Sequence, residues 1–318
     1  MKKAKRSCLE AIINLMVNSR ILIIGANGLI GQAVAREMGS MSSWQGTYYR
    51  RPVRGYLYCD ITDPDSLDDI FKQVKPACVI HCAQLAGGVD FYEKNPELAK
   101  KFHFEGTVNL SRECLKHGAK LIFISSECVF DGKKEFYNET DTPNPVNIYG
   151  KYKAESERWI SRHLKDYLII RTMSVFGWDP LTETPNAVMK AYFSITKAQK
   201  CIVQAFRWGT PTYVKDLAKA ILELSDSSAS GIFHIAGKTF INRYEWIRST
   251  CDALGWDTSL LIPQHKNNSG MAFRPVKIGL DTRKFSENFR TRLCTLEEAI
   301  KLLKRDISLM HQLESHKV

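Results

Sequence analysis

The chain of 318 residues is long enough for two domains, or for one nucleotide-binding domain with a smaller cap. Its formal net charge of +11 comes from basic residues that are scattered along the chain, apart from a cluster near the start. No basic stripe interleaves with aromatic residues and no run reaches membrane-spanning length, so we expect neither a nucleic-acid nor a membrane partner.

Strands and helices alternate from residue 20 onward, and residues 1–19 form an N-terminal extension before them. The apolar run over 20–24 predicts a buried strand, and a helix follows over 29–38. This order predicts an α/β fold built on a Rossmann-type, doubly wound parallel sheet. The further strands are expected at 45–50, 56–59, 77–83, 120–126 and 167–172, and the further helices at 64–73, 96–117 and 145–163.

The alternation of predicted strands and helices becomes less regular after residue 177. We expect a Rossmann domain over 20–177 that is rejoined by 200–237, where the run over 231–236 returns as a strand to the main sheet. A smaller C-terminal α/β substrate-binding cap would comprise 178–199 and 238–318. The ligand crevice is expected beyond the carboxyl ends of the parallel strands.

Nine cysteines occur without any Cys-x-x-Cys pair. Several lie in apolar runs, which indicates reduced thiols used as small hydrophobic side chains in a cytoplasmic protein. Cys78, His81 and Cys82 lie in a run that is typical of a buried strand, and no second ligand cluster follows. We therefore expect no metal site.

Three glycines at intervals of three follow the first predicted strand directly, at Gly25, Gly28 and Gly31. One would allow a sharp turn, one would let the backbone approach a pyrophosphate, and one would let the helix pack on the strand. The free N–H groups of the helix would face the phosphates. A strand before and a helix after these glycines predict a dinucleotide site.

The second predicted strand ends at Arg50 and Arg51. An acidic residue at this position would hold the ribose 2′-hydroxyl of NAD, whereas arginines suit a 2′-phosphate. The sequence therefore predicts NADP, used as NADPH, rather than NAD. The alternative is that both arginines are solvated surface residues.

Tyr149 and Lys153 are four residues apart, which places both on one face of a helix. Of the twelve tyrosines, only Tyr149 has a lysine at this spacing. Reduction of a ketone needs a proton on oxygen, and a lysine ammonium makes a phenol a better donor by stabilising its phenolate. Ser126, at the end of the preceding strand, would hydrogen-bond the carbonyl, with its neighbour Ser125 as the alternative.

Further segments along the chain are SSECVFDG (125–132), RTMSVFG (171–177), GTPTYVKDLA (209–218) and RPVKIGLDTRKF (274–285). Together they resemble the dTDP-4-dehydrorhamnose reductase branch of the extended short-chain dehydrogenase/reductase family, over about residues 20–305. The resemblance implies a reductase that uses NADPH on a 4-keto-6-deoxy nucleotide sugar. Besides the glycines, the arginines and the Tyr–Lys pair, the cofactor contacts that it implies are Asn27, Leu29, Ile30, Asp60, Ile61, Cys82, Ala83, Gln84 and Thr172. The substrate contacts that it implies are Glu127, Cys128, Arg207, Thr212 and Arg274.

The chain departs from this family at Ser126, Glu127 and Cys128, where Thr-Asp-Tyr is usual. Losing the aromatic side chain leaves the identity of the sugar open. A dehydratase would need a second carboxyl at Cys128, so dehydration is disfavoured. His103 stands where the family commonly has asparagine, and we expect a structural role for it.

Two alternatives to a reductase fit the same motifs. A nucleotide-sugar epimerase, or an epimerase–reductase, would recycle its cofactor in place. The regulatory subunit of methionine adenosyltransferase has this fold and binds NADP, yet acts as a partner-binding module. Because family members are often dimers, the resemblance also implies a homodimer as one candidate assembly.

Overall fold

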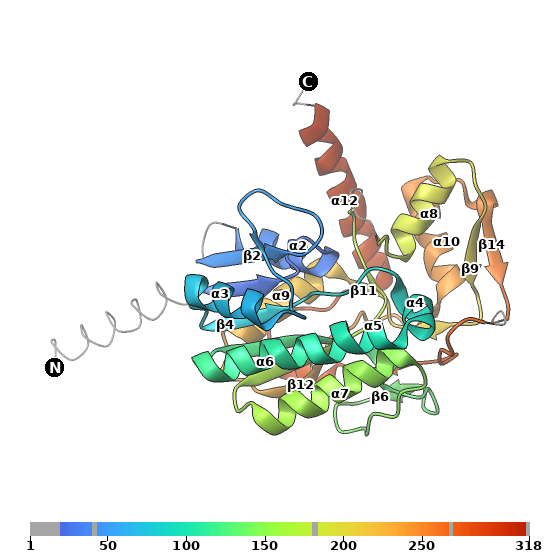
Figure 1. Ribbon diagram of the computed structural model, residues 1–318. Coiled ribbons are helices and arrows are strands. Elements are labelled where there is room, and N and C mark those ends of the chain that lie inside the picture. Colours follow the sequence, from blue (N-terminus) through green and yellow to red (C-terminus); the bar gives the residue numbers. More distant parts are fainter. Residues whose placement is uncertain (1–19, 40–42, 180–183, 267–269, 316–318) are drawn as a thin grey trace, which may run out of the picture.

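The computed structural model describes residues 20–39, 43–179, 184–266 and 270–315. A layered α/β unit fills most of the view in Figure 1, and a smaller lobe carrying α8, α10, β9 and β14 lies beside it. The extension predicted over 1–19 lies outside the described residues.

Seven parallel strands form the main sheet, in the order β12-β7-β5-β4-β1-β2-β3. Chain order reverses between β1 and β4, so the loops after these two strands leave the sheet in opposite directions and open a crevice at its carboxyl edge. The prediction of a Rossmann-type doubly wound sheet is confirmed. The strands are β1 (Ile21–Ile24), β2 (Trp44–Tyr48), β3 (Leu57–Tyr58), β4 (Cys78–His81), β5 (Lys120–Ser126), β7 (Tyr167–Thr172) and β12 (Gly231–His234).

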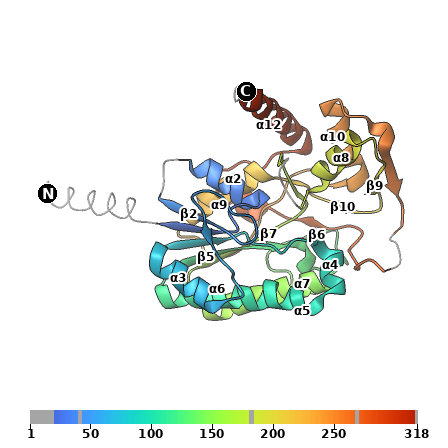
Figure 2. The same cartoon turned by 45° about the horizontal axis from the view of Figure 1, so that its top comes forward.

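Helices cover both faces of this sheet, and Figure 2 shows them in two layers. Strand residues alternate between the faces: Leu22 packs with α3, α6 and α7, whereas Ile23 packs with α2 and α9. Both faces are apolar, as expected for a sheet buried on two sides. The helices are α2 (Leu29–Met38), α3 (Pro64–Val74), α6 (Gly106–His117), α7 (Ile148–His163) and α9 (Val214–Ser225).

Residues 96–117, predicted as one helix, form a helix with a π-helical turn inside it. The parts are α5 (Pro96–Lys100), the π turn η1 (Lys101–Glu105) and α6. The turn shifts the helix by one residue and buries the side chain of His103. A short helix α4 (Gly88–Lys94), which the sequence did not predict, lies just before it.

The smaller lobe has its own apolar core, which includes Trp246, Leu261 and Leu303. The segment over 200–237, predicted to rejoin the Rossmann domain as a whole, is divided: β9 pairs with β14 in this lobe, whereas α9 and β12 lie on the main sheet. The lobe contains α8 (Ala187–Thr196), β9 (Cys201–Gln204), α10 (Arg243–Leu254), η3 (Thr258–Leu260), β14 (Leu261–Gln264) and α12 (Leu296–Ser315).

Further short strand pairs lie outside the main sheet: β8 with β11, β6 with β15, and β10 with β13. The helices in the described part of the chain all lack the length and apolar character needed to cross a bilayer. The remaining elements are η2 (Glu127–Val129), β6 (Phe136–Tyr137), β8 (Val175–Phe176), β10 (Trp208–Gly209), β11 (Thr212–Tyr213), β13 (Ile241–Asn242), β15 (Gly279–Leu280) and α11 (Arg283–Asn288).

Candidate active site

The glycine loop lies between β1 and α2, at the carboxyl edge of the main sheet. Gly25 has a φ of 77°, and a Cβ there would lie 2.7 Å from the Cα of Ala83, just after β4. A Cβ at Gly31 would lie 2.4 Å from the carbonyl oxygen of Gly25. The Gly25 N–H donates to the hydroxyl of Thr47 on β2 at 3.1 Å. Close backbone packing therefore requires glycine at 25 and 31.

The N-terminus of α2 fits a pyrophosphate. Gly28 is exposed at the N-cap, and the nearest atom to a Cβ placed there would be the Gly25 carbonyl oxygen at 3.4 Å. No side chain caps the helix, and no acidic residue lies in its first turn, which begins at Leu29 and Ile30. The N–H groups of this turn and the positive end of the helix dipole are thus available to an anion.

The two arginines after β2 have different surroundings. Arg51 is half-buried against the glycine loop, because the Asn27 side-chain amide donates to its carbonyl at 3.1 Å and its guanidinium donates to the Asn27 carbonyl at 3.5 Å. Arg50 is exposed, with its guanidinium carbon 5.8 Å from the centre of the Tyr49 ring. Both lie beside the loop, where a 2′-phosphate of a bound dinucleotide would be within reach of cations.

Asp60 follows β3 and lies at the same edge of the sheet. Its Oδ1 accepts from both the N–H and the hydroxyl of Thr62, each at 2.8 Å. Ile61 is buried against Gly106, where a Cβ would lie 2.8 Å from its side chain. The pair, which the resemblance gives as cofactor contacts, therefore lies between β3 and α6.

Three more predicted cofactor contacts follow β4 and one ends β7. Cys82 is half-buried, and burial raises the pKa of its thiol to about 12. Ala83 packs on the glycine loop, and Gln84 is exposed beside the hydroxyl of Tyr92. Thr172 is buried at the end of β7. All four lie at the carboxyl edge of the sheet, as their positions after parallel strands require.

The two serines at the end of β5 point to opposite sides. The Ser125 hydroxyl donates to Glu157 at 2.5 Å, and Glu157 forms a buried ion pair with Arg171 at 2.7 Å. The Ser126 hydroxyl donates instead to Glu127 at 2.6 Å, next to the start of α7. This geometry favours Ser126 as the serine that faces a substrate, because Ser125 is committed to a buried network.

Tyr149 and Lys153 lie on the face of α7 that packs against β5. The Tyr149 ring stacks on Tyr92 with centroids 5.4 Å apart and meets the edge of His103 at 5.2 Å. Lys153 Nζ donates to the carbonyl oxygen of Ile124 at 2.8 Å and lies 5.8 Å from the Tyr149 ring centre. Both side chains are buried, with 7% and 4% of their surface exposed. They therefore belong to the crevice and not to a solvated helix face.

Burial shifts both of these groups toward their neutral forms. It raises the pKa of the Tyr149 phenol well above 10.0, an effect that Cys128 increases and a hydrogen bond with Ser126 opposes. Burial lowers the pKa of Lys153 from 10.5 to about 8, and the charge of Glu157 opposes this shift. The phenol is therefore protonated at neutral pH, as a proton donor must be.

The N-terminus of α7 is held directly against η2. Asn147 caps the helix, with its Oδ1 accepting from the Gly150 N–H at 2.8 Å. A Cβ at position 150 would lie 1.9 Å from the Cys128 carbonyl oxygen, so only glycine fits. This packing fixes Tyr149 beside the residues after β5.

The predicted substrate contacts lie where η2 faces the smaller lobe. Glu127 and Cys128 are buried at the start of η2, and burial raises the pKa of the Cys128 thiol to about 12. The Thr212 hydroxyl is buried and donates to the Met173 carbonyl at 2.8 Å. Arg207 lies close enough to Glu127 for their charges to interact. Thr212 is thus engaged with the main chain, while Arg207 faces the crevice.

Arg274 is paired within the protein. Its guanidinium donates to both carboxylate oxygens of Asp90 on α4, at 2.7 and 2.8 Å, and the Ala272 N–H donates to the same carboxylate at 2.9 Å. The sequence analysis singled out Arg274 but missed Asp90, since nothing in the sequence links residues that are 184 positions apart. The pair ties the chain before β15 to α4.

A cleft between the sheet edge and the lobe contains one functional candidate that the sequence analysis missed, Arg243 at the start of α10. A single arginine within the segment predicted as the cap carries no recognisable signal. The residues that line this cleft are Met173, Ser174, Arg207, Trp208, Gly209, Pro211, Ile241, Arg243 and Trp246.

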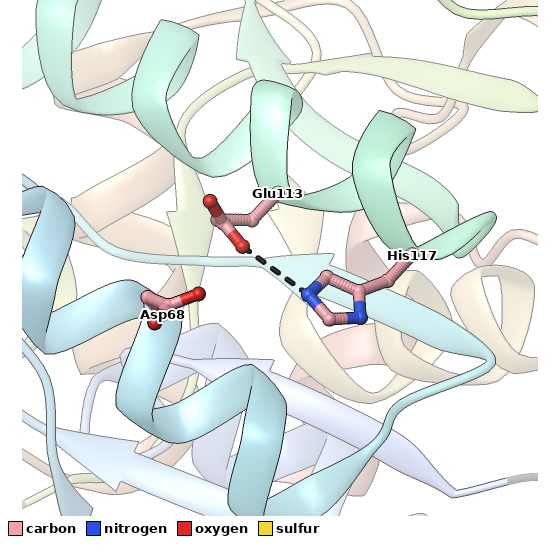
Figure 3. A group of neighbouring side chains, drawn as sticks. All are labelled: Asp68, Glu113 and His117. Atoms are coloured by element: carbon pink, nitrogen blue, oxygen red, sulfur yellow. Dashed lines mark ion pairs between the residues drawn. The ribbon is translucent and has the colours of Figure 1, made fainter.

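Among the described residues, Asp68, Glu113 and His117 form a cluster with metal-ligand chemistry on the outer surface of α3 and α6 (Figure 3). Lys116 lies 2.6 Å from Asp68 and 3.3 Å from Glu113, and Lys72 also pairs with Asp68. Ammonium groups therefore already balance the carboxylates. We interpret the cluster as a surface ion-pair network, which is worth little to stability.

The glycine loop, the strand ends and the Ser126–Tyr149–Lys153 set meet at one edge of a parallel sheet. Fold and site together define a dinucleotide-binding protein of the extended short-chain dehydrogenase/reductase class. Residues 19–308 match the family described as "RmlD substrate binding domain", and the chain belongs to this family. The resemblance to the dTDP-4-dehydrorhamnose reductase branch is thereby confirmed.

Known relatives include a reductase and the beta subunit of a methionine adenosyltransferase. The chain is 33% identical to "Methionine adenosyltransferase 2 subunit beta" of Danio rerio over 82% of each chain. It is 28% identical to "dTDP-4-dehydrorhamnose reductase" of Aggregatibacter actinomycetemcomitans over 72% of this chain and 76% of the relative. Sequence similarity therefore extends to proteins named for two of the three functions that the motifs left open.

Solved structures show the same fold. A dTDP-4-dehydrorhamnose reductase of Bacillus anthracis in complex with NADP has a TM-score of 0.81 and 25% identity, covering 91% of this chain and 99% of that one. A UDP-glucose 4-epimerase of Thermotoga maritima has a TM-score of 0.78 at 21% identity, covering 92% and 99%, and supports the fold alone. The NADP in the first structure agrees with the cofactor that Arg50 and Arg51 predict.

Proposed function

We propose that this protein is an oxidoreductase that uses NADPH to reduce the 4-keto group of a 4-keto-6-deoxy nucleotide sugar. The observation that carries the proposal is that Tyr149, Lys153 and Ser126 meet beside a glycine loop with a free helix N-terminus. Membership of the reductase family and the NADP-bound neighbour support it. In this proposal, the unit over 20–177 with β12 holds the cofactor and the lobe holds the sugar nucleotide.

Bound NADPH would supply the hydride. Ser126 would donate a hydrogen bond to the ketone oxygen and orient it, and Tyr149 would transfer its phenolic proton to that oxygen. The raised pKa of Tyr149 keeps the proton in place until substrate arrives. Lys153 and Ser126 would then stabilise the phenolate, and Lys153 would also hold the nicotinamide ribose. Arg50 and Arg51 would bind the 2′-phosphate.

The test is purified protein with NADPH and a panel of 4-keto-6-deoxy nucleotide sugars, followed by loss of the reduced nicotinamide absorbance. Tyr149→Phe is expected to lower turnover by a factor of about 10²–10⁴, because it removes only the acid. NADPH affinity, measured by fluorescence titration, should stay close to that of the unchanged protein. Turnover that survives in Tyr149→Phe would contradict the proposed role of this residue.

A second candidate is a regulatory subunit that binds NADP and a catalytic methionine adenosyltransferase. The observation in its favour is the 33% identity to the beta subunit over most of both chains. NADP binding without turnover of any keto sugar, together with a stable complex with the catalytic subunit in size-exclusion chromatography, would favour this candidate. An epimerase would instead retain its cofactor during purification and interconvert sugars without net oxidation of NADPH.

A further inference from the structure

Helix α7 carries a third buried polar side chain in line with the Tyr–Lys pair. Glu157 follows Lys153 by four residues, as Lys153 follows Tyr149, so the three side chains lie along one face of the helix. Glu157 is as buried as Lys153, with 4% of its surface exposed. A carboxylate is costly to bury, so one that lies a single turn beyond the ammonium indicates a role that the proposed reaction has not used.

Lys153 and Glu157 are anchored on consecutive residues of β5. Lys153 Nζ donates to the carbonyl oxygen of Ile124 at 2.8 Å. The Ser125 hydroxyl donates to Oε1 of Glu157 at 2.5 Å. Arg171 on β7 binds the same carboxylate from behind, with its Nε 3.0 Å from Oε1 and its Nη2 2.7 Å from Oε2. Donors on both oxygens hold the carboxylate in place and favour its charged form.

The other titratable side chains around Lys153 are neutral at pH 7. They belong to β4 and the residue after it, to the π turn and to α7: His81, Cys82, His103 and Tyr149. Burial, together with the charge of Lys153, lowers the pKa of the first imidazole to about 3 and that of the second well below 6.5. Burial raises the pKa of the thiol to about 12 and that of the phenol well above 10.0. The negative charge that acts on the ammonium is therefore that of Glu157, with the Arg171 guanidinium behind it.

We propose that Glu157 is a positioning residue of the active site, which keeps Lys153 in its ammonium form beside Tyr149. The inference rests on the proposed function, in which the ammonium stabilises the phenolate that proton transfer leaves. Burial favours the neutral amine, and the carboxylate one turn away opposes this effect. The carboxylate acts through its charge, because its oxygens bond Ser125 and Arg171. The Nζ donors that do not bond β5 thus stay available to the ribose and the phenolate.

The experiment follows the charge of Lys153 directly, by NMR titration of protein labelled with ¹³C at the Cε atoms of its lysines. The Lys153 signal is assigned from the spectrum of Lys153→Met. It should titrate near pH 8 in the unchanged protein and about one pH unit lower in Glu157→Gln, because the opposite charge is removed. Glu155→Gln is the matched control, since it makes the same charge change on α7 but on a different side of the helix. This control should titrate like the unchanged protein.

A double variant guards against loss of folding, because Glu157→Gln leaves the Arg171 guanidinium buried without its carboxylate. Glu157→Gln combined with Arg171→Gln removes both charges. Lys153 should then titrate at lower pH than in the unchanged protein, but at higher pH than in the single variant, since the guanidinium no longer repels the ammonium. Titration at the unchanged pH in the double variant would show that the ion pair has no net effect on Lys153, and would contradict the proposal.

The pH profile of kcat/KM with a 4-keto nucleotide sugar gives a second readout. Its decline at alkaline pH, where Lys153 loses its proton, should move to lower pH in Glu157→Gln by the same shift. Reduced turnover with an unmoved profile, or an equal NMR shift in Glu155→Gln, would overturn the assignment. A shifted NMR titration in a protein that turns over no keto sugar would support the action of Glu157 on Lys153 while contradicting the reductase.

Discussion

At the scale of single residues, Tyr149 keeps its proton because burial and the nearby Cys128 and Glu127 side chains raise the pKa of its phenol. The ammonium of Lys153 makes its hydrogen bond to a backbone carbonyl instead of to the phenol. Lys153 Nζ donates to the Ile124 carbonyl and lies 4.4 Å from the Phe123 ring centre. We expected Lys153 to make the phenol more acidic, but in this structure burial dominates and the pKa of Tyr149 is raised. Stabilisation of the phenolate would thus be needed only after proton transfer.

The adjacent serines allow a matched test of the carbonyl-binding role. Ser126→Ala is expected to lower kcat/KM by about 100-fold, because it removes a preorganised donor to the ketone oxygen. Ser125→Ala should leave turnover close to normal, because its hydroxyl serves Glu157, but should destabilise the fold by about 1–3 kcal/mol by removing a buried hydrogen bond. Steady-state kinetics and urea unfolding measure the two effects.

The opposite pattern, with turnover lost in Ser125→Ala and kept in Ser126→Ala, would exchange the two roles. The sequence favoured Ser126 but kept both serines open, since alternation along a strand says that they differ and not which one faces the crevice. The reason is visible only in three dimensions, in the ion pair of Glu157 with Arg171 behind the sheet.

The sequence indicated that Tyr149 and Lys153 lie together, but it did not indicate how the arginines near the cleft are arranged. Tyr149 and Lys153 share one helix, so their spacing alone places them together. Arg207, Arg243 and Arg274 meet through long-range packing: a strand pair aligns the first two, and Asp90 on α4 captures the third. Local patterns carry no information about such pairs, and α4 itself is too short to produce a clear periodicity.

At the scale of secondary structure, the long periodic elements were predicted and the short ones were not. The predictions of helix 29–38 and strand 120–126 agree with the bounds of α2 and β5. The π turn inside 96–117 was missed, because inserting one residue into a helix leaves its composition unchanged. That turn nevertheless places the ring of His103 against Tyr149.

Substitution by alanine should have a different effect at the middle glycine of the loop, Gly28, than at the last one, Gly31. Gly31→Ala forces a Cβ to 2.4 Å from backbone and should destabilise the protein by about 1–3 kcal/mol, even without cofactor. Gly28→Ala meets nothing closer than 3.4 Å, so the fold should persist, while a bound pyrophosphate would meet the added methyl. We expect NADPH affinity to fall about tenfold or more for an overlap of this kind.

Thermal unfolding without cofactor and fluorescence titration with NADPH separate these outcomes. Gly118→Ala would be a poor control, because Gly118 has a φ of 65°, a left-handed backbone conformation in which alanine is strained. A better one is Ala35→Gly on α2, which weakens the same helix by about 1 kcal/mol without approaching the loop. If Gly28→Ala bound NADPH normally, the N-terminus of α2 would not be the phosphate site.

At the scale of the whole molecule, the return of β12 to the main sheet joins distant parts of the chain. The sequence predicted this return, but it could not show that the preceding segment would split, with β9 pairing to β14 in the smaller lobe. Isolated strands of four residues give no sign of their partners. The split matters because it places Arg207 between the two parts, at the cleft.

His234 at the end of β12 is buried and contacts both β6 and β7. Its Nδ1 lies 3.1 Å from the Tyr137 carbonyl on β6, and its Nε2 lies 3.4 Å from the guanidinium of Arg171. The neutral tautomer with a proton on Nδ1 satisfies both contacts, whereas a charged imidazole would oppose Arg171. Burial, with the charge of Arg171, accordingly lowers the pKa of His234 from 6.5 to about 3.

This shift predicts a specific acid sensitivity. Below pH 6.5 the unfolded chain binds a proton at His234 that the folded protein does not bind until about pH 3, so the free energy of unfolding falls as pH decreases through this window, by up to about 1.4 kcal/mol per pH unit. His234→Gln keeps an acceptor for Arg171 and a donor for Tyr137 but cannot titrate. Its urea-unfolding free energy should therefore fall less steeply between pH 6 and 4, by about that slope. The exposed His265→Gln should follow the unchanged protein, and parallel curves for His234→Gln would show that this imidazole does not couple folding to pH.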